Sequence, residues 1–284
     1  AYLSYCLTGK IKNEYTNFTT TGFVNVNSYS RDTHITDALG IKSDIFGEVL
    51  MPGDIIGEFT EEMRELAGFN ARVVFCPSHD TASAVASSPI KGNDVYISSG
   101  TWSLIGIENK TPVVTDAARE ANFANEGGIE KRFRFLKNYM GMWLLQSIRR
   151  ALNKSMTYDE MMEAAMKSGA YSYIDVNARE FVAPDNMIEA IRTYLGRPDL
   201  PLGEVINSVY HSLARSYKDA VSEIEKISGT TAESIHIVGG GSKDKYLNRL
   251  TAEYTGKAVT AGPVEATALG NIISQLAADD TSYT

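Results

Sequence analysis

The sequence predicts an α/β fold with a mixed β-sheet. Short apolar segments that are typical of buried strands, such as residues 95–97 and 235–238, alternate with helical segments along much of the chain. The longest helical segment, about residues 203–227, repeats its apolar residues every three or four positions, which indicates one buried face. With 284 residues, of which 43% are hydrophobic, the chain can bury a sizeable core in one large domain or two smaller ones.

Short elements are expected in the first 70 residues. We expect three helices, at residues 1–9, 34–40 and 60–67, and one turn at residues 51–54. Gly9 is predicted to end the first helix, because glycine readily adopts the left-handed conformation that closes many helices. Thr60 is predicted to cap the third helix and Gly68 to end it.

Longer elements are expected from about residue 71 onward. Strands are predicted at residues 73–76, 95–97, 104–107, 133–136, 235–238 and 258–260. Helices are predicted at residues 82–86, 140–152, 157–168, 186–195, 203–227, 243–255 and 266–277. His211 falls outside the apolar stripe of the longest helix, so its side chain is expected to be solvated.

The charge and the composition argue against several classes of protein. A net charge of −8 and an isoelectric point of about 5.1 disfavour a nucleic-acid or anionic-membrane surface, which needs dense lysine and arginine. No apolar run approaches ~18 residues, so no membrane-spanning helix is expected. Two cysteines and four scattered histidines predict a cytoplasmic protein with reduced thiols and no zinc site.

The first candidate site is the stretch Ser78-His79-Asp80-Thr81, which follows a predicted strand and precedes a predicted helix. Catalytic groups of open α/β sheets gather at the C-terminal ends of strands. A carboxylate there, that of Asp80, can accept a hydroxyl proton as phosphoryl transfer begins. Position alone leaves open the alternative that Asp80 only caps the helix.

The second candidate is the turn at Ser98–Trp102, between two predicted strands. Its glycine and its hydroxyl residues, Thr101 among them, offer N–H and O–H donors to phosphate oxygens. The same residues suit an ordinary hairpin, and that alternative also stays open.

The third candidate is Gly239-Gly240-Gly241-Ser242-Lys243, between a predicted strand and a predicted helix. Glycines let a backbone approach a ligand closely, and a helix N-terminus attracts an anion. The spacing fits neither a P-loop nor a dinucleotide-binding fingerprint, and a tight turn is an equal alternative.

The fourth candidate lies in the stretch Leu136–Gln146. Asn138 is expected at the end of a strand and Gln146 on the helix that follows. Both are polar exceptions in an apolar run, whereas Trp143 is expected in the core.

The order of these four stretches resembles that of one family, the FGGY carbohydrate kinases, which have the actin-like ATPase (ribonuclease H-like) fold. The resemblance covers nearly the whole chain. It is carried by Ser78–Val85, Ser98–Leu104, Asn125–Gly128, Leu136–Gln146, His236–Gly241 and Gly262–Asn271, and by Asn13–Asn17, which is similar to the end of the N-terminal domain of the family. Leu136–Gln146 and Gly262–Asn271 look most similar to the branch that phosphorylates L-rhamnulose.

The resemblance implies a role for each candidate residue. Asp80 would be the catalytic base that accepts the proton of the terminal hydroxyl of the sugar. The sugar would be bound by His79, Asp80, Thr81 and Asn138. ATP would be bound by Thr101, Gln146, Gly240 and Asn248. No residue is assigned to a metal.

The implied reaction is transfer of the γ-phosphoryl group of ATP to O1 of L-rhamnulose, with Mg²⁺ bridging the phosphates, in the catabolism of L-rhamnose. The alternative is a catalytically silent actin-like module that binds nucleotide or sugar. The expected partners are the sugar and ATP, without nucleic acid or membrane. The expected state is a monomer or a weak homodimer.

The resemblance also implies two domains. Residues 1–72 are expected to be the C-terminal remnant of the first, sugar-side domain, and residues 73–284 the complete or nearly complete second, nucleotide-side domain. The Asp-x-Gly-Thr/Ser phosphate loop of the first domain has no counterpart in the sequence. The chain is therefore expected to lack most of that domain, which puts catalysis by this chain alone in question.

Overall fold

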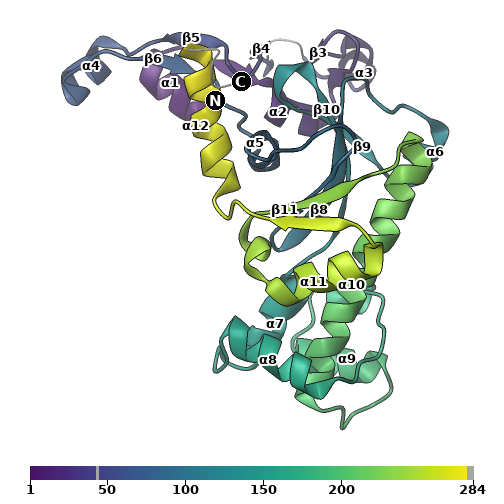
Figure 1. The fold of residues 1–284 in the computed structure, drawn as a ribbon. Coiled ribbons are helices and arrows are strands. Elements are labelled where there is room, and N and C mark those ends of the chain that lie inside the picture. Colours follow the sequence, from purple (N-terminus) through teal and green to yellow (C-terminus); the bar gives the residue numbers. More distant parts are fainter. Residues whose placement is uncertain (43–44, 280–284) are drawn as a thin grey trace. The chain divides into compact units, whose positions relative to one another are not determined.

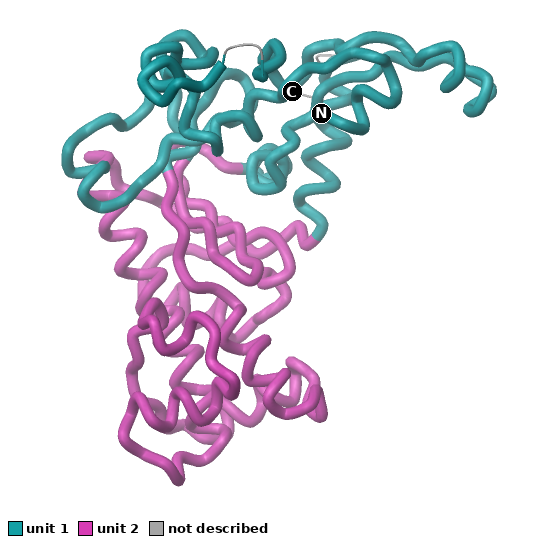
Figure 2. Tube along the Cα trace, turned by 180° about the vertical axis from the view of Figure 1, so that it is seen from behind, with its two compact units in different colours: residues 1–89, 108–135, 265–284 teal, residues 90–107, 136–264 magenta. Residues whose placement is uncertain are grey.

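The computed structural model describes residues 1–42 and 45–279 (Figure 1). The chain divides into two compact units (Figure 2). The first unit comprises residues 1–89, 108–135 and 265–284, and the second comprises residues 90–107 and 136–264. Each unit is therefore assembled from segments that are distant in the sequence.

The first unit contains many short elements. Its helices are α1 (Tyr2–Thr8), α2 (Tyr15–Phe18), α3 (Thr33–Ala38), α4 (Glu61–Ala67), α5 (Asp80–Ala86), α6 (Asp116–Glu120) and α12 (Ala266–Asp279). Its strands are β1 (Lys12–Glu14), β2 (Val24–Asn25), β3 (Ser30–Arg31), β4 (Glu48–Leu50), β5 (Ile55–Glu58), β6 (Arg72–Val74) and β9 (Ala124–Gly127). Strands β1 and β4 pair in parallel, whereas β2–β3 and β5–β6 are antiparallel pairs.

Local signals fixed the helix ends of this unit where they were predicted. Helix α1 ends at Gly9, whose φ of 71° lies in the left-handed region. At the start of α4 the Thr60 hydroxyl accepts a hydrogen bond from the Met63 N–H, and Gly68 ends that helix with a φ of 78°. Both caps are confirmed.

The predicted buried strand at residues 73–76 differs from the structure. Strand β6 covers Arg72–Val74 and pairs only with β5, and none of its residues is fully buried. A pair of two strands has too little surface to enclose its apolar side chains, so an apolar run need not become a central strand. Asp80 therefore does not follow a strand of the large sheet.

The second unit contains the longer elements. Its helices are α7 (Trp143–Ala151), α8 (Tyr158–Ser168), α9 (Met187–Tyr194), α10 (Leu202–Ser228) and α11 (Lys245–Thr255). Its strands are β7 (Val95–Ser99), β8 (Trp102–Asn109), β10 (Phe133–Met140), β11 (Ser234–Val238) and β12 (Ala258–Ala261), of which β8 and β10 continue into the first unit.

Together with β9, these strands form a six-stranded mixed sheet in the order β12-β11-β7-β8-β10-β9. Strand β11 is parallel to both β7 and β12, with Ile237 opposite Ile97 and Ala261. Strands β7 and β8 form an antiparallel hairpin. The predicted α/β class with a mixed sheet is confirmed.

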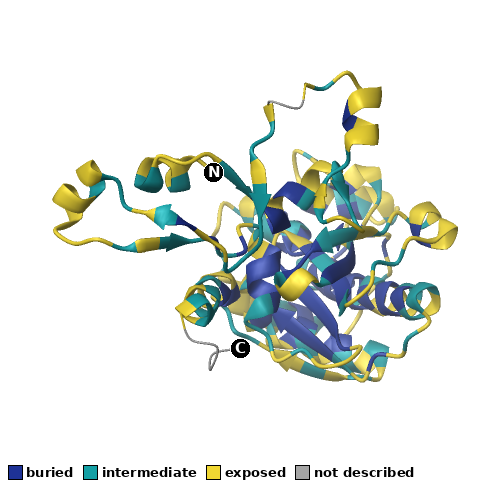
Figure 3. Cartoon of the chain, turned by 90° about the horizontal axis from the view of Figure 1, so that it is seen from above, coloured by how far each residue is buried: buried dark blue, intermediate teal, exposed yellow. Residues whose placement is uncertain are grey.

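Helix α10 supplies much of the core of the second unit. Its predicted apolar stripe is buried, with Val205, Val209 and Leu213 fully inaccessible to solvent. Each such side chain contributes about 1.5–3 kcal/mol relative to an exposed one. Figure 3 shows the buried residues gathered at the sheet and its neighbouring helices, while α4 is exposed or half-buried throughout. No helix in the described ranges combines the length and apolar character that crossing a bilayer requires.

His211 is not solvated as expected. Its ring stacks on Tyr171 at 3.6 Å between centroids, and its Nδ1 lies 2.8 Å from the hydroxyl of Tyr254. These tyrosines come from outside α10, so the periodicity of that helix holds no information about them.

Helices α5 and α12 pack at unusually close range in the first unit. A Cβ added at Gly270 would lie 2.6 Å from the carbonyl carbon of Ser83 and closer still to its oxygen. The Ser83 hydroxyl also donates to the carbonyl oxygen of Thr267 at 2.8 Å. Only glycine at position 270 lets the two backbones approach so closely.

Replacing Gly270 with alanine is expected to lower the free energy of unfolding by about 1–3 kcal/mol, because the added methyl group has no space between the helices. Urea unfolding would measure this as a lower midpoint at an unchanged slope. Ala268→Ser adds one atom at an exposed site of the same helix and should shift the midpoint little. Equal effects of the two substitutions would contradict the close-contact explanation.

Candidate functional site

Asp80 is the first residue of α5, and 81% of its side chain is exposed. Its Oδ1 accepts a hydrogen bond from the Thr81 N–H at 2.7 Å. The N-cap residue is His79, so the structure does not support the alternative that Asp80 occupies that position. The carboxylate lies at the helix N-terminus, where the dipole favours a negative charge, and its exposed oxygen is accessible to a ligand.

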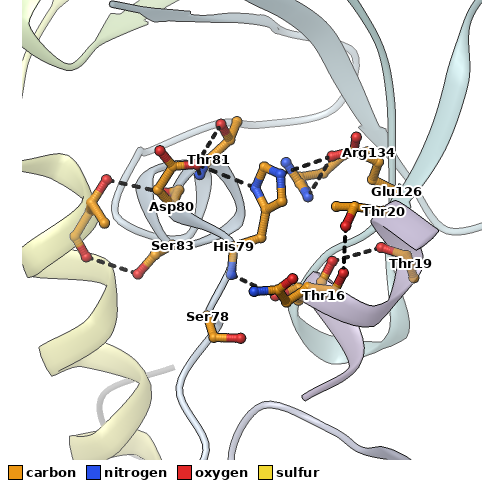
Figure 4. A network of polar contacts seen from close by, with 12 residues as sticks. Thr16, Thr19, Thr20, Ser78, His79, Asp80, Thr81, Ser83, Glu126 and Arg134 are labelled. Carbon is orange, nitrogen blue, oxygen red and sulfur yellow. Dashed lines mark hydrogen bonds and ion pairs between the residues drawn. The ribbon is translucent and has the colours of Figure 1, made fainter. Parts of the chain in front are cut away.

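His79 lies beside this carboxylate (Figure 4). Its Nδ1 is 3.5 Å from Oδ1 of Asp80, and its Nε2 is 3.6 Å from Oε2 of Glu126. Burial, followed by the positive charge of Arg134, lowers the pKa of the His79 imidazole. The imidazole is therefore mainly neutral near pH 7, with one ring nitrogen a donor and the other an acceptor.

A buried ion pair between Arg134 and Glu126 lies next to His79. The guanidinium of Arg134 is fully buried on β10, and its Nη2 donates to Oε2 of Glu126 at 3.0 Å. Its Nε donates to the carbonyl oxygen of Gly127 at 3.0 Å. Breaking such a pair by removing one partner strands a buried charge, so Arg134 holds Glu126 in place next to His79.

Sequence reasoning assigned no role to Arg134 or Glu126. A signal for each was present, because Arg134 interrupts the apolar strand segment Phe133–Leu136 and Glu126 lies in the family-like stretch Asn125–Gly128. A charged residue inside a buried strand needs a partner, which the sequence alone does not name.

The backbone of Asp80 is also held by α12. The Thr267 hydroxyl donates to the carbonyl oxygen of Asp80 at 3.2 Å. Together with the Ser83 contact to the same residue, this bond attaches the first turn of α5 to α12. Thr81 is buried at that turn, and its hydroxyl lies 3.3 Å from Oδ1 of Asp80.

In the second unit, the hairpin between β7 and β8 supports the start of α7. The N–H groups of Met142 and Trp143 donate to the carbonyl oxygens of Gly100 and Thr101, at 2.9 and 3.2 Å. The Thr101 hydroxyl donates to Oε1 of Gln146 at 3.2 Å. The structure thus brings together two residues that were predicted to bind ATP.

The glycine triplet packs against the end of β7. Gly239 has a φ of 81°, and a Cβ at Gly241 would lie 2.7 Å from Cβ of Ser99. A Cβ at Gly240 would meet no atom within 4 Å. The first and third glycines are therefore required by the fold, whereas the middle one borders open space.

That open space is a pocket of about 620 Å³, a volume typical of sites for nucleotide-sized ligands. Its lining includes Gly100, Gln146, Gly240 and the side chains of Arg149 and Lys243. Arg149 and Lys243 can pair with the phosphate groups of a ligand, while Asp159 and Asp244, which also line the pocket, offset their charge.

Thr101 is not among the residues that line the pocket and is linked to it by its hydrogen bond to Gln146. Two further predicted ligand residues are also absent from the lining. Asn248, on α11, donates from Nδ2 to the carbonyl oxygen of Ser242 at 2.9 Å and so holds the loop that carries Gly240. Asn138 lies two residues before the end of β10, and its side chain is exposed. A direct ligand contact of either residue stays a prediction.

Family models cover both parts of the chain. Residues 95–278 match the C-terminal domain of the FGGY family of carbohydrate kinases. The chain belongs to this family. Residues 1–87 match the N-terminal domain of the FGGY family, so the predicted resemblance is confirmed. The division that we predicted between residues 72 and 73 stays a prediction.

Curated relatives show which members of the FGGY family the chain resembles. The chain is 43% identical to a rhamnulokinase of Halalkalibacterium halodurans over 279 residues, which cover 96% of the chain. It is 43% identical to that of Oceanobacillus iheyensis and 41% identical to that of Bacillus subtilis, each over 284 residues and 98% of the chain. The chain spans about 60% of the length of these relatives.

Solved structures of FGGY-type kinases share the fold. Xylulose kinase from Lactobacillus acidophilus superposes with a TM-score of 0.76 at 17% identity, covering 99% of this chain and 58% of that one. Plasmodium falciparum glycerol kinase with ADP superposes with a TM-score of 0.79 at 12% identity, covering 99% of this chain and 57% of that one. The predicted actin-like fold is confirmed.

The neighbouring glycines Gly240 and Gly241 should respond differently to alanine. Gly241→Ala is expected to lower the free energy of unfolding by about 1–3 kcal/mol, because its methyl group would overlap Ser99. Gly240→Ala should leave stability nearly unchanged, since its methyl group would point into open space. Urea unfolding measures both, and a destabilised Gly240→Ala variant would show that this residue does not border a pocket.

His79 predicts a pH-dependent stability. Its folded-state pKa is lowered from an unfolded value near 6.5, so its contribution is present above about pH 6.5 and is lost as the pH falls through the folded pKa. In His79→Asn this loss should be smaller, as measured by urea unfolding at pH 7.5 and at lower pH. His34→Asn, at an exposed site, is the control. An equal loss in wild type and His79→Asn would refute the prediction.

Proposed function

We propose that this chain carries the catalytic base and the nucleotide pocket of a cytoplasmic, ATP-dependent sugar kinase. Its reaction would convert L-rhamnulose and ATP to L-rhamnulose 1-phosphate and ADP, in the catabolism of L-rhamnose. The observation that carries the proposal is the exposed carboxylate of Asp80 beside the half-buried imidazole of His79 in a member of a carbohydrate-kinase family. Identities of 41–43% to rhamnulokinases support the choice of sugar. The free thiols of Cys6 and Cys76 support the cytoplasm.

In the proposed reaction, Asp80 accepts the proton of the O1 hydroxyl as that oxygen bonds to the γ-phosphorus of ATP. The bond between this phosphorus and the bridging oxygen breaks, and ADP leaves. His79 and Thr81, on either side of Asp80, would hydrogen-bond the sugar, and Asn138 would add a further contact. A positioned general base of this kind accelerates a reaction about 10²–10⁴-fold.

The nucleotide is proposed to bind in the pocket of the second unit. Thr101 and Gln146, linked at 3.2 Å, would contact the phosphates and the nucleotide, and Gly240 would lie against the adenosine part. Lys243 and Arg149 would add positive charge, because both line the pocket. Asn248 would act through the loop that it holds, in addition to any direct contact.

Mg²⁺ is proposed to accompany the nucleotide. Within the described residues, no group of three or more histidines, cysteines or carboxylates is arranged to hold a metal ion. This fits Mg²⁺, which keeps several waters and binds largely through substrate phosphates, and no residue of the chain is assigned to it. When bound, the ion would neutralise charge on the phosphates.

The Asp80→Asn substitution tests the base. We expect kcat with L-rhamnulose to fall about 10²–10⁴-fold while the Kd for ATP stays unchanged, because the amide accepts no proton. An ADP-release assay and calorimetric titration of the full-length gene product would measure the two quantities. Asp116→Asn, also an exposed aspartate in the first turn of a helix, is the matched control. An active Asp80→Asn enzyme would overturn the assignment.

The same assay tests the sugar. Turnover of D-xylulose or glycerol but not of L-rhamnulose would overturn the substrate and keep the class of enzyme. ATP binding without turnover of any of these sugars would favour the silent binding module.

A further inference from the structure

We propose that Glu14 and Thr16 are positioning residues that fix the backbone in front of the catalytic Asp80. The inference rests on the proposed function of Asp80. Both residues lie in the first unit, at the junction of β1 and α2, some 64 positions away from the stretch that they hold.

Glu14 accepts more hydrogen bonds than a helix N-cap needs. It is the N-cap of α2, and its carboxylate accepts hydrogen bonds from the N–H groups of Thr16 and Asn17, at 2.8 and 3.0 Å. These two bonds complete an ordinary cap. The same carboxylate also accepts from the N–H and the hydroxyl of Ser78, at 3.0 and 2.7 Å.

The carboxylate of Glu14 is held by neutral donors alone. It is buried, and among the described residues no lysine, arginine or histidine forms an ion pair with it. A buried charge without a counter-ion is tolerated only when hydrogen bonds replace its water. The N–H and the hydroxyl of Ser78 therefore stabilise the buried carboxylate of Glu14, and the carboxylate in turn holds Ser78 in place.

Thr16 extends the contact by one residue. Its hydroxyl donates to Oε2 of Glu14 at 2.6 Å. The same hydroxyl accepts from the N–H of His79 at 3.2 Å (Figure 4). The side chain is fully buried, so water cannot replace this bond. Two successive peptide N–H groups, those of Ser78 and His79, are thus fixed by side chains from one short segment.

The next residue along the chain is Asp80. Its own carbonyl oxygen is held from the other side by Thr267 of α12. With the preceding N–H groups and the following carbonyl group both bound, the main chain at Asp80 has little freedom to rotate. A fixed main chain fixes the Cα–Cβ bond from which the carboxylate extends, which matters because a displacement of about 1 Å can cost roughly 10²-fold in rate.

The test is a pair of substitutions at Thr16. Thr16→Val keeps the volume but removes the hydroxyl, and kcat with L-rhamnulose should fall about 10- to 100-fold at an unchanged Kd for ATP. Thr16→Ser restores the hydroxyl and should recover most of the lost kcat. Thr20→Val is the control, because the exposed Thr20 hydroxyl donates to the carbonyl oxygen of Asn17 in the preceding helix α2.

Amide hydrogen exchange in the full-length protein gives a readout that does not depend on turnover. The His79 N–H should exchange faster in Thr16→Val than in wild type and Thr16→Ser. If Thr16→Val does not fold, Glu14→Gln serves in its place. Its amide nitrogen takes the place of one carboxylate oxygen and accepts no hydrogen bond, and its remaining neutral oxygen is a weaker acceptor for the Ser78 N–H than the carboxylate. Faster exchange of the Ser78 N–H and a lower kcat are then expected.

The outcomes separate the two proposals. An inactive Asp80→Asn enzyme together with unchanged kcat in Thr16→Val would overturn the positioning role and leave the base in place. An unchanged exchange rate of the His79 N–H in Thr16→Val would show that Thr16 does not hold the backbone. That result would overturn the inference whatever the kcat of the variant. An active Asp80→Asn enzyme would overturn the proposed function, and with it the catalytic role of the contacts that Glu14 and Thr16 make.

Discussion

The first unit depends on the buried carboxylate of Glu14. It has to find hydrogen-bond donors for both oxygens without water, and it finds them on its own helix and on Ser78. Because these donors come from segments far apart in the sequence, satisfying one charge ties the N-terminal part of the chain to the start of α5. The buried Arg134–Glu126 pair follows the same rule beside His79.

Elements with local signals could be predicted from the sequence. Gly9 and Thr60 mark helix ends through their own backbone preferences, and the stripe of α10 follows from helical periodicity alone. The partial exposure of strand β6 could not be predicted, because the burial of a strand depends on how many strands lie beside it. The prediction that His211 is solvated was wrong for a similar reason, since the rings around it come from other parts of the chain.

The candidate site divides in the same way. Its motifs were visible as short stretches, and the contact between Thr101 and Gln146 agrees with their shared prediction. The roles of Glu14 and Arg134 could not be predicted from the sequence, because each acts through partners that only folding brings near. Charged residues in otherwise apolar or half-buried stretches are the trace that such partners leave in a sequence.

The hairpin turn that supports α7 also gives the second unit an optical label of its own. The only two tryptophans of the chain, Trp102 and Trp143, flank this turn, one following Thr101 and the other bound to its carbonyl oxygen. The indole of Trp102 is exposed, whereas that of Trp143 donates to the carbonyl oxygen of Phe181 at 3.0 Å. All of the tryptophan emission of this chain thus comes from two residues in direct contact with Thr101, by covalent bond or hydrogen bond, and a ligand that reaches the turn meets the exposed indole of Trp102 without an added dye.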